Sequence, residues 1–139
     1  MNKKCTVFIT EDDHDDASFL KQALIDSSFN GNIEHLDNGR LLLDKLNDSK
    51  QKKSLPELII LDLNMPLKGG LEVLSVMNAD PEYKSIPVAV VTASLNNEDE
   101  VRCKRLGCDL FRKKPVRLSD YQIIATDIVT LLRSRFAHC

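Results

Sequence analysis

Short apolar runs alternate with helix-like stripes along the chain. Lys4–Thr10 is β-branched and aromatic, which predicts a strand that ends at a cluster of acids. From Asp15 onward apolar residues recur at helical spacing, and Asn30–Gly31 supplies a stop. Asn32–Leu36 predicts a weak second strand, and a second helix ends near Asn47. The pattern predicts a repeating strand–helix order.

The second half of the chain repeats this order. Asp48–Ser54 is polar and predicts a loop. Leu58–Leu61 and Pro87–Thr92 are apolar without alternation, which is typical of parallel strands buried on both faces. The other expected elements are helices over Leu71–Met77 and Glu98–Leu106, a strand over Asp109–Lys113 and a last helix from about Leu118. Five strand–helix units predict a doubly wound α/β sandwich with a parallel sheet.

Length and charge limit the function classes. The chain has 139 residues, the usual size of one domain, and its net charge of −2 gives no sign of a nucleic-acid partner. No run approaches the ~18 apolar residues of a membrane span. The apolar stretch before Glu11 is too short for a secretory signal, so we expect a cytoplasmic protein with no membrane contact.

Four cysteines lack the spacing of a metal site. They contain no C-x-x-C pair, and no histidine lies at zinc-ligand spacing from Cys103 and Cys108. We therefore expect four reduced thiols, in agreement with a cytoplasmic location. His138 and Cys139 fall at a terminus that we expect to fray.

Polar side chains follow four of the predicted strands. Because ligands of parallel sheets bind at the carboxyl ends of the strands, these residues should meet at one edge. They are Glu11, Asp12 and Asp13 after the first strand, Asp62 and Asn64 after the third, Thr92 and Ser94 at and after the end of the fourth, and Lys114 after the fifth.

These groups suit phosphoryl transfer. Crowded carboxylates repel one another unless a divalent cation lies between them, and hard oxygen ligands favour Mg²⁺. A carboxylate can be the nucleophile, and Asp62 ends the most buried strand. The Lys114 ammonium and the Thr92 hydroxyl could each meet a phosphoryl oxygen.

The sequence resembles bacterial response-regulator receivers from about Lys4 to Arg133. The resemblance implies a single receiver domain over residues 1–139 (core 4–133) without an output domain, and a flavodoxin-like (βα)5 fold with strand order 2-1-3-4-5. It rests on Glu11–Asp12, Asp62–Pro66 with Gly70, Val91–Ala93 and Lys113–Pro115.

The resemblance also assigns roles at the site. It implies that Asp62 is the phosphoacceptor and, with Asp12, a direct Mg²⁺ ligand. The backbone carbonyl of Asn64 would be a third ligand, with Glu11 acting through water. The switch residues would be Thr92, Lys114 and the aromatic Phe111, the Lys114–Pro115 bond would be cis, and Asn64 and Ser94 would tune the rate of phosphoryl loss.

Some acids and apolar residues have simpler readings. Asp15 and Asp16 are interpreted as charges favoured by a helix N-terminus. Gly69 stands where the family often has an Asp and predicts a weaker N-cap. Ile123 and Val129 lie off the core stripe of the last helix, which indicates either an interface or scattered surface residues.

The expected role is that of a signalling phosphoacceptor and not of an enzyme with external substrates. The partner would be a sensor histidine kinase or phosphotransfer protein, and a second copy is a further candidate. The surface of the fourth helix, fifth strand and fifth helix would carry the signal. The stretches 47–54 and 80–87 resemble stand-alone receivers of the phytochrome-associated type.

Two other classes use related residues. A haloacid-dehalogenase-type phosphatase forms an aspartyl phosphate, but it needs D-x-D after its first strand. A pseudo-receiver that only binds should lack some of Asp12, Asp62, Thr92 or Lys114, and all four are present.

Overall fold

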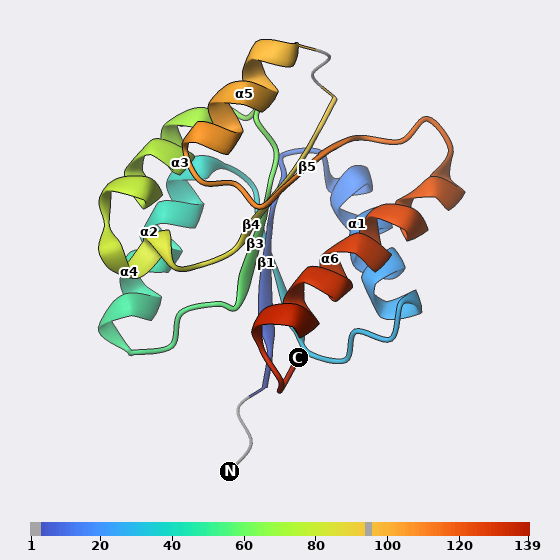
Figure 1. Ribbon diagram of the computed structural model, residues 1–139, viewed down its shortest axis with the longest axis horizontal. Coiled ribbons are helices and arrows are strands. Elements are labelled where there is room, and N and C mark those ends of the chain that lie inside the picture. The colour runs from blue at the N-terminus through green and yellow to red at the C-terminus, as the bar shows by residue number, and fades with distance from the viewer. Residues whose placement is uncertain (1–3, 94–95) are drawn as a thin grey trace.

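The computed structural model describes residues 4–93 and 96–139 of the chain. Its five strands form one parallel sheet in the order β2-β1-β3-β4-β5 (Figure 1). The predicted doubly wound, flavodoxin-like fold is therefore confirmed. The strands are β1 (Thr6–Thr10), β2 (Asn32–Leu36), β3 (Leu58–Leu61), β4 (Val88–Thr92) and β5 (Leu110–Lys113).

Helices cover both faces of the sheet. In Figure 1, α1 and α6 lie on one side of the strands, and α2, α3, α4 and α5 lie on the other. The helices are α1 (His14–Asp26), α2 (Gly39–Gln51), α3 (Gly70–Ala79), α4 (Pro81–Lys84), α5 (Asn97–Arg105) and α6 (Tyr121–Arg135), the last preceded by a 3₁₀ turn, η1 (Leu118–Asp120). No described helix has the length and apolar character that a membrane crossing requires.

The central strand β3 supplies both halves of the core. Leu58 and Ile60 join the cluster under α1 and α6, whereas Ile59 and Leu61 join the cluster under α2, α3 and α5. All four side chains are buried, as expected for a strand covered on both faces. This packing fixes the position of Asp62, which follows the strand directly.

The helices differ from the prediction in two respects: α2 is longer, and there is one additional short helix. Residues 48–51, expected in a loop, extend α2, because Ser49 is buried and Lys52 pairs with Asp48 one turn earlier. The short helix α4 was not predicted; Asp80 caps it and Pro81 stands in its first turn. The fourth and fifth predicted helices are consequently α5 and α6.

The prediction of four reduced thiols is wrong for two of them. Cys5 and Cys139 form a disulfide across a sequence separation of 134, while Cys103 and Cys108 are free. The pairing arises because α6 runs antiparallel to β1, so the chain returns to the amino end of the sheet (Figure 1). Spacing along the sequence gave no sign of this proximity. The terminus is consequently held in place.

One residue of the last helix was also misplaced. Val129 is buried in the cluster under α1 and α6, because the apolar stripe of α6 is wider than the sequence pattern indicated. Ile123 is 63% exposed, as predicted.

Candidate functional site

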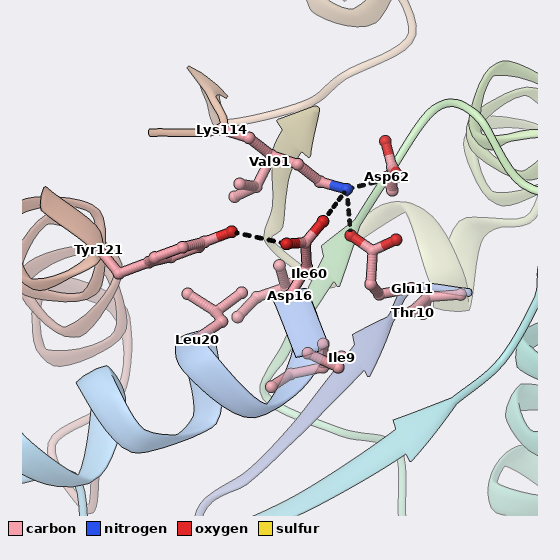
Figure 2. A pocket seen from close by; sticks show the side chains of 11 residues that line it. Ile9, Thr10, Glu11, Asp16, Leu20, Ile60, Asp62, Val91, Lys114 and Tyr121 are labelled. Atoms are coloured by element: carbon pink, nitrogen blue, oxygen red, sulfur yellow. Dashed lines mark hydrogen bonds and ion pairs between the residues drawn. The ribbon is translucent and has the colours of Figure 1, made fainter. Parts of the chain in front are cut away.

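One lysine and three carboxylates meet at the carboxyl end of the sheet (Figure 2). The Lys114 Nζ lies 2.6 Å from Glu11 Oε1, 2.8 Å from Asp16 Oδ2 and 3.2 Å from Asp62 Oδ2. Glu11 follows β1, Asp62 follows β3, and Lys114 follows β5. The predicted convergence of strand ends on one edge is therefore present, with one ammonium facing three acids.

Two of the three carboxylates are buried. Asp62 is 4% exposed and Glu11 6% exposed. Burial raises the pKa of Glu11 to about 8, because its effect exceeds that of the Lys114 hydrogen bond and the nearby charge of Asp62 adds to it. Burial alone would lower the pKa of Lys114, but the hydrogen bonds to Asp16 and Glu11 and the charge of Asp62 raise it. Lys114 is therefore charged at neutral pH.

Asp16 belongs to this site, which the sequence interpretation missed. It lies in the first turn of α1, as predicted, but its carboxylate also pairs with Lys114. The Tyr121 hydroxyl donates to the other oxygen of Asp16 at 3.3 Å (Figure 2). Burial and the Asp16 charge raise the pKa of Tyr121 to about 12. A sequence signal existed: Asp16 is one helical turn beyond the acids that follow β1.

Three acids of the site offer a place for a cation. One carboxylate oxygen from each of Glu11, Asp12 and Asp62 lies within 4.8 Å of the others. Hard oxygen donors at this spacing fit Mg²⁺. Asp12 is exposed, so a hydrated ion could reach the group from solvent. The backbone of Asn64 lies beside this group of acids, since its N–H donates to Asp62 Oδ1 at 3.4 Å.

A tight loop holds Asp62 in place. The Gly70 N–H donates to the Leu63 carbonyl at 3.0 Å. A Cβ atom at Gly70 would lie 2.4 Å from the Asp62 carbonyl oxygen, so a side chain there would displace the backbone of Asp62. Gly69 caps α3 without a side-chain hydrogen bond, as predicted from its missing side chain.

The expected switch residues lie around this edge. Thr92 ends β4 and is fully buried, and its carbonyl accepts from the Lys114 N–H at 2.8 Å. Phe111 on β5 is half-buried and packs against the core cluster under α2, α3 and α5. Asn64 is exposed beside the site. Ser94, the other residue expected to tune the rate, lies outside the described residues.

The expectation of a cis bond before Pro115 is wrong for this structure. No peptide bond between described residues is cis, and the Lys114–Pro115 bond is therefore trans. The trans isomer of such bonds is intrinsically favoured by about 0.5–1 kcal/mol. The ion pairs of Lys114 described above are made with this isomer.

Known proteins share this fold and sequence. A family profile described as the response regulator receiver domain matches residues 7–125. The chain is 30% identical over 121 residues to response regulator Rcp1 of Synechocystis sp., covering 86% of this chain and 82% of that protein. It is 30% identical over 123 residues to a probable methanogenesis regulatory protein, FilR2, of Methanothrix harundinacea, covering 88% and 79%.

Solved structures agree with these matches. The phosphorylated cyanobacterial phytochrome response regulator RcpA superposes with a TM-score of 0.87 and 29% identity, covering 96% of this chain and 97% of that one. The Mn²⁺-bound form of Rcp1 gives a TM-score of 0.81 and 28% identity, with coverage of 96% and 97%. The chain therefore belongs to the response regulator receiver family of two-component signalling proteins.

Proposed function

We propose that this receiver accepts a phosphoryl group on Asp62 with the help of Mg²⁺. The observation that carries the proposal is the environment of Asp62. Its carboxylate is buried at the end of the central strand, 3.2 Å from the Lys114 ammonium and beside Glu11 and Asp12. The donor would be a sensor histidine kinase or a phosphotransfer protein.

The transfer requires little chemistry of the protein beyond position and charge. An oxygen of Asp62 attacks phosphorus, the bond from phosphorus to the donor breaks, and its electron pair leaves with the donor. Lys114 and the Thr92 hydroxyl would then bind oxygens of the new aspartyl phosphate. Asp12, Asp62 and the Asn64 carbonyl would hold Mg²⁺, with Glu11 acting through water. When bound, the ion would supply positive charge to the transferred group.

The signal would leave through the surface of α5, β5 and α6. Val101 on α5 is 50% exposed and Ile123 on α6 is 63% exposed, which supports an apolar contact with a partner or with a second copy. The similarity to the phytochrome response regulator RcpA and to a bacteriophytochrome response regulator supports a phytochrome-type kinase as the donor. We also place the protein in the cytoplasm, which is the typical location of the receiver family.

Incubation with acetyl phosphate and Mg²⁺ tests the proposal. Intact-mass measurement should show the gain of one phosphoryl group, which is lost on mild alkaline treatment. Asp62→Asn should abolish the gain, whereas Asp44→Asn, an exposed acid of α2, should retain it. No gain in the unaltered protein would reject the proposed phosphoacceptor role. Steady hydrolysis of an added phosphate ester would favour the phosphatase class instead.

A further inference from the structure

Two histidines and an aspartate meet beside the phosphorylation site. His14 opens α1, His35 lies in β2, and Asp37 follows that strand. His14 Nε2 is 2.8 Å from Asp37 Oδ1, and His35 Nε2 is 3.8 Å from the same oxygen. The two rings meet edge to face with centroids 5.2 Å apart. One nitrogen or oxygen from each of the three side chains lies within 4.8 Å of the others.

These separations match a shared metal ion. In a tetrahedral site with bonds of about 2.0–2.1 Å, neighbouring ligand atoms are about 3.3 Å apart. The two observed distances to Asp37, 2.8 and 3.8 Å, lie on either side of that value. The three atoms lie within 4.8 Å of one another, so rotation of the side chains would bring them onto one ion. A water molecule would complete the coordination, since the side chains are exposed.

The ion pair between His14 and Asp37 does not require the second imidazole, whose Nε2 hydrogen-bonds the Glu11 carbonyl at 2.6 Å and also faces Asp37. Asp37 needs one cation, and His14 already supplies a hydrogen bond to it. If both imidazoles were charged, they would repel each other across 5.2 Å. As neutral ligands they can share a divalent ion with the carboxylate, and the repulsion is absent.

We propose that His14, His35 and Asp37 form a binding site for Zn²⁺ or a similar first-row transition-metal ion. Imidazole nitrogens select zinc, nickel and copper over Mg²⁺, which prefers oxygen ligands. The site therefore differs in chemistry from the acidic group of Glu11, Asp12 and Asp62. The His14 side chain is 73% exposed and the Asp37 side chain 54% exposed, so an ion can enter directly from solvent.

Metal binding would change one hydrogen bond of His35. Its Nε2 is 2.6 Å from the Glu11 carbonyl oxygen, which can only accept, so Nε2 carries the proton in the metal-free protein. Coordination through Nε2 exchanges this hydrogen bond for a metal bond and moves the proton to Nδ1. The metal bond has to compensate for the hydrogen bond that the Glu11 carbonyl loses, because Glu11 is only 6% exposed.

Titration calorimetry with ZnCl₂ in a large excess of Mg²⁺ tests the site, because Mg²⁺ occupies the acidic group. We expect one Zn²⁺ per chain, and His14→Ala and His35→Ala should each weaken binding at least about tenfold. His138→Ala is the matched control, since it removes the third histidine of the chain, and it should leave the affinity unchanged. Asp37→Asn should weaken binding without removing a histidine.

Three results would overturn the proposal. One is the absence of Zn²⁺ binding in the unaltered protein. Another is an affinity of the His14→Ala and His35→Ala variants that equals the affinity of the unaltered protein. The third is binding that survives in both histidine variants and disappears in Cys108→Ser, which would place the ion at the thiols of Cys103 and Cys108. Circular dichroism of each variant verifies the fold, and Asp62→Asn must bind Zn²⁺ normally even if phosphorylation at Asp62 is not found.

Discussion

The two ends of the sheet bury acidic side chains with different partners. At the amino end, Glu57 is 3% exposed, and its carboxylate accepts from the Thr6 N–H at 2.8 Å, with His138 3.6 Å away. The Cys5–Cys139 disulfide closes the same end. At the carboxyl end, Glu11 and Asp62 each accept one longer backbone N–H bond, from Asp13 at 3.2 Å and from Asn64 at 3.4 Å. They also share the Lys114 ammonium, which pairs with Asp16 as well.

The difference separates a structural end from a reactive one. Backbone donors and a covalent bond cannot be exchanged without partial unfolding, so the amino end is fixed. An ammonium on a flexible stem can leave one carboxylate for another or for a phosphoryl oxygen. The molecule is therefore expected to keep its amino end rigid while charges rearrange at the opposite edge.

Opening the disulfide should have the largest effect on stability. A crosslink over 134 residues restricts the unfolded chain strongly, and its loss should lower the free energy of unfolding by roughly 4 kcal/mol. Urea unfolding with and without dithiothreitol measures the change. The double variant Cys5→Ser, Cys139→Ser should not respond to the reductant. Equal unfolding midpoints of the oxidised and reduced protein would mean that the amino end is not held covalently.

Removing the ammonium should have the next largest effect. Lys114→Ala leaves Glu11, Asp16 and Asp62 without their cation, and we expect a loss of roughly 3 kcal/mol in the metal-free protein. Added Mg²⁺ should restore part of the lost stability. Lys104→Ala is the matched control, since Lys104 makes an exposed pair within α5. If the two variants unfold alike, the carboxyl end does not depend on Lys114.

The pH dependence of stability should identify Glu11. Its folded-state pKa of about 8 lies above the ordinary value of 4.5, so the folded protein binds the extra proton between these values. The contribution of Glu11 to the stability of the metal-free protein should therefore be fully present below pH 4.5 and fall by on the order of 2 kcal/mol as pH rises from there towards 8. Glu11→Gln should flatten this slope when unfolding is measured at several pH values. A slope unchanged by Glu11→Gln would assign it to another group.

Among these groups, the Tyr121 hydroxyl should contribute least to the stability of the fold. Tyr121→Phe removes one hydrogen bond to Asp16 and keeps the packing of the ring, so we expect a loss of about 0.5–1 kcal/mol. The same variant should alter the rate of labelling by acetyl phosphate less than Asp16→Asn, which removes a charge from Lys114. Equal rates in the two variants would indicate that Asp16 does not position the lysine.

The sheet could be predicted from the sequence because its central strands are apolar and the residues that follow them are polar. Leu58–Leu61 is wholly apolar and buried, and acids, a threonine and a lysine follow the strands at one edge. Asp16 was interpreted only as a helix charge, since its contact with Lys114 joins positions 98 residues apart. The disulfide was missed for the same reason. Local sequence patterns predict helices and strands, whereas contacts between residues far apart in the sequence depend on how those helices and strands pack.

The position of the labile phosphoryl group tests the central claim most directly. Protein labelled with acetyl phosphate and Mg²⁺ is reduced with borohydride, which converts an aspartyl phosphate to homoserine, and is then digested and sequenced by mass spectrometry. We predict homoserine at position 62 and at no other acid of the site. Homoserine at Asp12 or Asp16, or none at all, would contradict the assignment of Asp62 as the phosphoacceptor.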